Sequence, residues 1–154
     1  MIAVIQRTDS STVTVDGKCV GKAGRGLCIL LGVAREDTRQ DAELLAAKIS
    51  KLRIFSDEND KMNLSVTDVG GEVLVVSNFT LLANYSHGNR PEYFGAADPK
   101  AANELYEYFA SLMEAQVGHV GRGVFGAHML LDIQGNGPVT IVMDSEKLKK
   151  KSKG

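Results

Sequence analysis

The sequence has few cysteines and no long apolar run, which argues against a secreted or membrane-spanning protein. The two cysteines, Cys19 and Cys28, fall in strand-like stretches and not in a disulfide framework. The first residues, MIAVIQR, have no basic leader and too short an apolar stretch for a signal peptide. No apolar run approaches the length of a membrane span. We therefore expect a cytoplasmic protein with reduced thiols and no membrane partner.

Excess positive charge is also missing, because the formal net charge is −1. No overall field therefore draws the chain to nucleic acid. Basic residues gather only at the C-terminus, at Lys147, Lys149, Lys150, Lys151 and Lys153. This end is either a solvated tail or an arm that contacts phosphates. We assign residues 1–145 to one folded domain and residues 146–154 to a basic, flexible C-terminal tail.

The familiar catalytic and metal-binding motifs are absent. The chain has no Walker loop, no Gly-x-Ser-x-Gly elbow, no Cys-x-x-Cys pair and no His-Glu-x-x-His motif. Its three histidines, His87, His119 and His128, lack the spacing of metal ligands, so we expect no metal. His128 is read as a hydrogen-bonded or solvent-facing side chain. Cys28 is a poor nucleophile, since an apolar strand raises the pKa of a thiol.

What is present predicts one α+β domain with two main helices. Apolar residues recur at helical spacing over about residues 37–52 and 98–116, and Asp98-Pro99 makes a good helix start. The apolar run at residues 26–33 fits a strand buried on both faces. Other strands are expected at residues 2–7, 12–15, 18–20, 72–77, 124–125, 128–133 and 139–143, with a hairpin turn at 16–17. The long loop at residues 83–97 has a length that is often functional.

One of the three prolines interrupts a predicted strand. Pro138 follows Gly137 and leads directly into residues 139–143. Proline has no backbone N–H and cannot complete a ladder inside a sheet, and glycine leaves the main chain bare. We expect this pair at a sheet edge, in a turn, or where backbone carbonyls have another use.

A second candidate site lies at the end of the strand at residues 72–77. Ser77 and Thr80 carry hydroxyls there, a common place for binding groups, but no base is near them in sequence. The hydroxyls either bind a substrate or satisfy local backbone groups. A site without a base works mainly by backbone N–H groups and positioning.

Two segments, SNFTL at residues 77–81 and GPVT at residues 137–140, resemble the signature segments of the D-aminoacyl-tRNA deacylases of the bacterial and eukaryotic type. Further matches lie at residues 1–7, 24–27, 31–33, 53–57, 61–64, 70–77, 90–91 and 125–129, so the resemblance reaches about Ser145. It implies a homodimeric, barrel-like single domain of mostly antiparallel sheets, with no cofactor. The implied activity is hydrolysis of the ester of D-aminoacyl-tRNA, and of glycine mischarged on tRNA(Ala), in translation quality control.

The resemblance also implies roles for residues. Ser77, Asn78, Phe79 and Thr80 would line the catalytic cleft, where the N–H of Phe79 or of Thr80 stabilises an oxyanion. The 2′-hydroxyl of the terminal adenosine would assist the attacking water.

In this family the Gly-Pro bond is cis, so Gly137 and Pro138 would reach into the partner subunit's site. Their carbonyls would exclude an L side chain there. Phe125 and Met129 either shape the adenosine pocket or pack in the core.

The chain departs from the family pattern in ways that keep alternatives open. Asn78 stands where the family usually has glutamine, and the loop at residues 88–93 has one cation fewer and one carboxylate more. Gly135-Asn136 also precedes the Gly-Pro pair where asparagine followed by a variable residue is common. The main alternative is a non-catalytic relative that binds aminoacyl-tRNA or RNA. A small-molecule esterase lacks the nucleophile and base that it would need.

Overall fold

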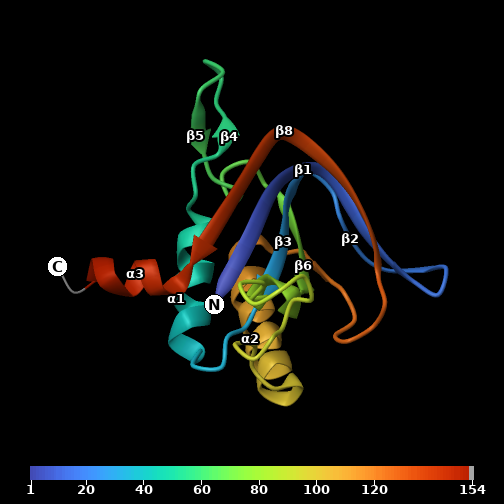
Figure 1. Cartoon of the computed structure of the whole chain (residues 1–154). Helices are drawn as coiled ribbons and strands as arrows, with labels where there is room; N and C mark the ends of the chain where they lie inside the picture. The colour runs from blue at the N-terminus through green and yellow to red at the C-terminus, as the bar shows by residue number, and fades with distance from the viewer. Residues whose placement is uncertain (153–154) are drawn as a thin grey trace.

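The computed structural model describes residues 1–152, with side chains placed for residues 1–149. The sheet strands β1, β2 and β8 arch together over two packed helices, and a short hairpin projects from one end (Figure 1). The predicted α+β class is confirmed. In chain order the elements are β1 (Ile2–Val15), β2 (Lys18–Ala23), β3 (Gly26–Gly32), α1 (Arg39–Ser50), β4 (Phe55–Ser56), β5 (Met62–Leu64), β6 (Glu72–Ser77), the 3₁₀ turn η1 (Phe79–Leu82), α2 (Pro99–Val117), β7 (Val120–Arg122), β8 (Leu130–Asp144) and α3 (Ser145–Ser152).

The main sheet is mixed, whereas we expected mostly antiparallel sheets. Strand β1 pairs antiparallel with β2, β3 and β8. Strand β6, however, runs parallel to both β3 and β7. Parallel neighbours need a crossover connection, and α1 and α2 lie in the two connections concerned. The buried strand predicted at residues 26–33 is β3, which lies between β1 and β6.

The sheet nearly closes into a barrel where β2 approaches β7. A Cβ atom on Gly21 would lie 2.3 Å from the carbonyl oxygen of Arg122. A Cβ atom on Gly121 would lie 2.4 Å from the carbonyl oxygen of Lys22. Side chains at these glycines would hold the strands apart, so their absence permits the contact. The ring nitrogen Nε2 of His119 lies 2.8 Å from the same Lys22 oxygen.

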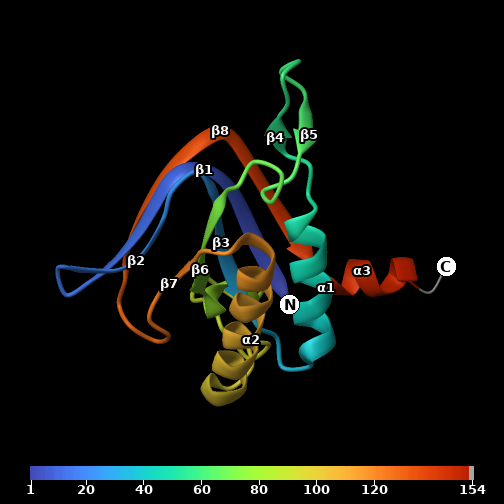
Figure 2. The ribbon, with the colours of Figure 1, turned by 180° about the vertical axis from the view of Figure 1, so that it is seen from behind.

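The two predicted helices α1 and α2 pack side by side under the sheet (Figure 2). The Asp98 side chain caps α2 by accepting the N–H of Ala101, and Pro99 is its first residue, as the sequence predicted. The core between helices and sheet is formed by fully buried apolar side chains, among them Ile5, Ile29, Leu45, Ile49, Phe109 and Met113. In the described residues no helix is long and apolar enough to cross a membrane.

The last strands differ from the prediction. Residues 124–125 are not a strand, and β7 lies earlier, at Val120–Arg122. The predicted strands at residues 128–133 and 139–143 are joined in the long strand β8, which begins only at Leu130. The outer edge of β8 has no partner among the described residues. Pro138 fits because the register slips: Thr140 lies opposite Gln6 and Gly135 lies opposite Thr8, so residues 136–139 bulge out. The Gly137–Pro138 bond in this bulge is cis.

Residues Ser145–Ser152 of the basic C-terminal segment form α3, and residues 153 and 154 fall outside the described part. Ser145, at the start of α3, donates a hydrogen bond to the buried carboxylate of Asp41 over 2.6 Å. The Lys149 ammonium lies 2.9 Å from the same carboxylate. The lysine-rich composition indicated a solvated end, but these long-range contacts bind α3 to α1. Burial acts to raise the pKa of Asp41, yet the hydrogen bonds from Ser145, the Thr38 N–H and Lys149 lower it to about 2.

This network predicts acid-sensitive stability. Because the pKa of Asp41 is lower in the folded than in the unfolded chain, its contribution is present above about pH 4 and is lost as pH falls towards 2. The whole contribution of Asp41 is about 2 kcal/mol, and about 1 kcal/mol of it should be lost between pH 7 and pH 3, because pH 3 lies between the folded and unfolded pKa values. Urea unfolding at pH 7 and pH 3 measures this loss. Asp41→Asn should reduce the pH difference by about 1 kcal/mol, and the exposed Asp132→Asn should not. Equal pH dependence in wild type and Asp41→Asn would contradict the role.

Candidate active site

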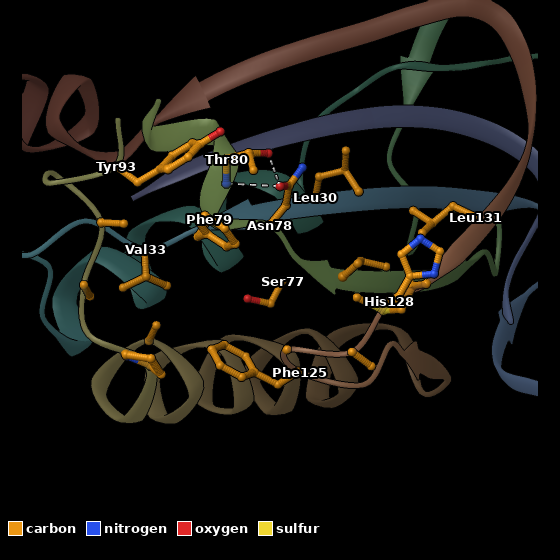
Figure 3. A pocket seen from close by; sticks show the side chains of 18 residues that line it. Leu30, Val33, Ser77, Asn78, Phe79, Thr80, Tyr93, Phe125, His128 and Leu131 are labelled. Atoms are coloured by element: carbon orange, nitrogen blue, oxygen red, sulfur yellow. Dashed lines mark hydrogen bonds between the residues drawn. The ribbon is translucent and has the colours of Figure 1, made fainter. Parts of the chain in front are cut away.

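A cavity of about 800 Å³ lies between the end of β6, η1, the start of α2 and the segment before β8 (Figure 3). It brings together the candidate residues from residues 77–80 with Phe125 and Met129. The whole lining comprises Leu30, Val33, Val76, Ser77, Asn78, Phe79, Thr80, Tyr93, Ala96, Ala97, Pro99, Ala102, Phe125, Gly126, Ala127, His128, Met129 and Leu131.

The end of β6 presents the first of these residues to the cavity. Strand β6 is buried up to Val76, and the chain then turns into η1 with Asn78 as its N-cap. The Asn78 N–H donates to the Leu31 carbonyl over 2.8 Å, which fixes the turn against β3. The Asn78 Oδ1 atom accepts the Thr80 N–H over 3.2 Å and also the Thr80 hydroxyl. Thr80 is therefore bound to an amide oxygen and not to a base.

The neighbouring N–H, that of Phe79, has no acceptor among the described residues. The Phe79 and Thr80 N–H groups, both considered as oxyanion donors from the sequence, therefore differ: that of Thr80 is bound to Asn78, and that of Phe79 is available to a ligand. The Phe79 ring is 57% exposed and meets the Tyr93 ring edge-to-face, with centroids 5.0 Å apart. The mouth of the cavity thus has an aromatic wall beside a free backbone donor.

Phe125 and Met129 line the cavity and also pack against buried clusters. The Phe125 ring lies 6.3 Å from that of Tyr106. Tyr106 donates its hydroxyl to the Val75 carbonyl over 2.9 Å, and burial raises its pKa to about 12. Tyr106 therefore stays neutral and supports the site as a packed hydrogen-bond donor.

The cavity lining is mostly apolar and contains no carboxylate, lysine, arginine or cysteine. Its titratable side chains are Tyr93 and His128. Burial raises the pKa of the nearby Cys28 thiol to about 11, so the thiol stays protonated. In the described part of the chain no three His, Cys, Asp or Glu side chains are grouped to hold a metal ion. This arrangement can bind an aromatic or apolar ligand and donate hydrogen bonds to it.

Sequence reasoning missed several residues of the lining. Tyr93, Ala96 and Ala97 belong to the loop at residues 83–97, whose length was the available signal. The N–H of Ala97 bonds the Val33 carbonyl over 2.9 Å and brings this loop to the cavity. His128 was read as a hydrogen-bonded or solvent-facing side chain, but it lines the cavity while remaining exposed.

Gly137 and Pro138 do not reach this cavity within their own chain. They line a separate depression of about 290 Å³, together with Gln6, Arg7, Gly135, Val139 and Thr140. Both are exposed.

Arg7 holds the bulge that carries them. Its Nε atom donates to the Asn136 carbonyl over 2.9 Å and its Nη1 atom to the Ile54 carbonyl over 2.7 Å. The Asn136 amide in turn donates to Asp9 over 2.7 Å. The Gly-Pro pair is thus a supported, outward-facing main-chain surface.

Known proteins resemble the chain over nearly its whole length. A family model described as D-Tyr-tRNA(Tyr) deacylase matches residues 4–144. The D-aminoacyl-tRNA deacylase of Caldicellulosiruptor bescii is 50% identical over 148 residues, which cover 96% of this chain and 99% of that protein. The D-aminoacyl-tRNA deacylase of Deinococcus deserti is 54% identical over 144 residues, covering 94% and 99%.

Solved structures share the fold. The c-Myc DNA unwinding element binding protein superposes with a TM-score of 0.88 at 39% identity, covering 94% of this chain and 98% of that chain. A probable eukaryotic D-amino acid tRNA deacylase superposes with a TM-score of 0.82 at 16% identity, covering 93% and 98%.

Proposed function

The chain belongs to the D-aminoacyl-tRNA deacylase family and is a hydrolase of that type, and we propose that it hydrolyses D-aminoacyl esters of tRNA in the cavity beside η1 and rejects L-aminoacyl esters. The observation that carries this proposal is the free Phe79 N–H at the mouth of a largely apolar cavity. Such a site suits a substrate with an aromatic base and a variable side chain, and it stabilises charge with main chain.

In the proposed reaction, water attacks the ester carbonyl carbon and the carbonyl oxygen becomes an oxyanion. The Phe79 N–H donates to that oxygen, while the Thr80 N–H remains occupied by Asn78. Because the cavity lining offers no carboxylate, the 2′-hydroxyl of the terminal adenosine relays the proton: it accepts one from the attacking water and passes its own to the 3′-oxygen. The C–O bond then breaks, and the 3′-oxygen leaves with a proton. Phe125 and Met129 hold the adenosine.

The proposed stereochemical gate comes from a second copy of the chain. Gly137 and Pro138 are exposed, and they lie in a depression separate from the cavity. Arg7 and Asp9 support their bulge, which suits a rigid wall placed against the α-carbon of a substrate. A wall of main chain ignores the identity of the substrate side chain, so it accepts many D-amino acids and also glycine, such as glycine mischarged on tRNA(Ala).

A homodimer is the assembly that this gate requires. Support comes from the unpaired outer edge of β8 in the described residues and from large apolar side chains on the surface. Val142 and Leu130 of β8 are 69% and 62% exposed. Apolar side chains along a free strand edge suit an interface between copies. We also keep the prediction of a cytoplasmic enzyme acting in translation quality control, with tRNA as its partner.

The decisive experiment compares matched substrates. We expect D-tyrosyl-tRNA to be hydrolysed at least about 100-fold faster than L-tyrosyl-tRNA, because the gate clashes with an L side chain. Glycyl-tRNA(Ala) should also be hydrolysed, since glycine has no side chain to clash. Release of labelled amino acid under single-turnover conditions measures all three rates. Equal hydrolysis of the D and L esters would overturn the gate.

The same experiment tests the alternative of a non-catalytic relative. Asn78 is one methylene shorter than the usual glutamine, and its oxygen is engaged by Thr80. Binding of D-tyrosyl-tRNA without turnover would favour the alternative and overturn the proposed hydrolysis.

A further inference from the structure

His128 gives one end of the cavity a polar group that the proposed hydrolysis does not use. In Figure 3 its imidazole lies beside Leu131, while Val33 and Tyr93 lie at the other end and Ser77 lies between. The labelled neighbour of His128 in the lining, Leu131, is apolar (Figure 3). The imidazole is exposed, so it can meet a ligand that leaves the cavity at this end.

The local chain fixes His128 in this place. The Ala127 N–H donates to the Val124 carbonyl over 3.1 Å, which closes a β-turn. Gly126 lies in that turn with φ of +78°, a conformation that glycine adopts without steric cost. Next along the chain, the Met129 sulfur packs closely on Gly123, where an added Cβ would lie 2.7 Å from it. His128 therefore follows a defined turn.

The His128 ring has no hydrogen-bond or ion-pair partner among the described residues. It is absent from the side-chain contacts that hold the fold, whereas His119 bonds the Lys22 carbonyl. The cavity lining also places no carboxylate beside it that would repel an anion. A polar side chain that is exposed, unpaired and located at a cavity end is available to a ligand.

We propose that His128 donates an N–H to the phosphate that joins the terminal adenosine to the preceding nucleotide of tRNA. This inference rests on the proposed function, in which the ester lies near Phe79 and the adenosine contacts Phe125 and Met129. His128 adjoins Met129 in the chain and lies at one end of the cavity (Figure 3), so an adenosine held by Met129 has its 5′ side beside the imidazole in this proposal. Hydrogen bonding of imidazole to phosphate is charge-assisted and sequence-independent.

The test compares D-tyrosyl-adenosine with D-tyrosyl-adenosine 5′-phosphate, two esters that differ only in that phosphate. We expect the phosphate to raise kcat/KM of the wild type by about fivefold to tenfold, mainly through KM. His128→Ala should lose this gain and keep the wild-type rate on the ester without phosphate. His128→Lys should recover the gain, because an ammonium also binds phosphate.

His119→Ala serves as the matched control, since His119 does not line the cavity, and it should keep the gain from the phosphate. An equal loss on both esters in His128→Ala would overturn the proposal, because it would assign the ring to the nucleoside. A phosphate gain that survives in His128→Ala would also overturn it. Failure of the wild type to hydrolyse D-tyrosyl-tRNA would instead overturn the proposed function.

Discussion

Phe79→Pro should lower kcat for D-tyrosyl-tRNA hydrolysis by about 10²- to 10³-fold relative to Phe79→Ala. Both variants lose the aromatic ring, but only proline also loses the backbone N–H. The N–H of Phe79 has no acceptor among the described residues, so its removal breaks no contact of the fold. The difference between the two variants therefore reports the oxyanion interaction alone. Single-turnover hydrolysis at saturating enzyme measures it.

The local structure at Phe79 accommodates proline, so a loss of activity in Phe79→Pro can be assigned to the missing N–H. Phe79 is the first residue of η1, the helical position at which proline is most readily accommodated. Asn78 before it has φ of −144° and ψ of 92°, an extended conformation that suits a residue preceding proline. The bond from the Thr80 N–H to Asn78 involves neither changed atom. Thermal unfolding of Phe79→Pro should stay close to that of Phe79→Ala.

Phe79→Ala is the control for the ring, which packs edge-to-face on Tyr93. We expect it to raise KM with a smaller change in kcat, because the ring contacts substrate in the ground state and in the transition state alike. Equal kcat values for the alanine and proline variants would show that the Phe79 N–H does not stabilise the transition state.

Local sequence signals predicted the helices and the hairpin turn at residues 16–17 between β1 and β2, but not the parallel strand pairing. The Asp98-Pro99 start and the apolar stripe are contained in α2 itself, and the observed helix Pro99–Val117 agrees with them. The parallel pairing of β6 with β3 and β7 depends on segments far apart in the chain, which no local pattern encodes. The near closure of the barrel depends on Gly21 and Gly121, where β2 and β7 come close. Nothing in the sequence around either glycine indicates this contact.

In the candidate site, too, some residues could be predicted from the sequence and some features could not. Residues 77–80 and residues 125–129 were found through family segments, and they line one cavity. The difference between the Phe79 and Thr80 N–H groups follows from the orientation of the Asn78 side chain, which a sequence does not specify. The contact of Ser145 at the start of α3 with Asp41 is long-range, so no local sequence pattern indicated it.

The second large effect concerns the origin of the gate. Arg7→Ala removes the donors that hold Asn136 and Ile54, so the bulge of Gly137 and Pro138 should lose its fixed position. We expect the preference for D- over L-tyrosyl-tRNA to fall by about tenfold or more, since a loss of two or three hydrogen bonds loosens the wall. Gln6→Ala is the matched control from the same depression and should keep the preference.

A heterodimer of the Phe79→Pro chain and the Arg7→Ala chain, isolated with two different tags, then separates a gate in the partner from a gate in the same chain. If the gate comes from the partner, the intact Phe79 of the Arg7→Ala chain faces the firm bulge of the Phe79→Pro chain. The second site combines both defects and is nearly inactive. The heterodimer should therefore hydrolyse D-tyrosyl-tRNA with wild-type selectivity at about half the wild-type rate.

A gate within one chain predicts the opposite result, because the active Phe79 would then be guarded by its own loosened bulge. The heterodimer would show the low selectivity of its Arg7→Ala parent. Only a gate donated across the interface makes a mixed dimer more selective than the one parent that supplies its activity. The ratio of D to L hydrolysis in the purified heterodimer, measured against both homodimers, decides between the two arrangements without requiring that either variant be fully inactive.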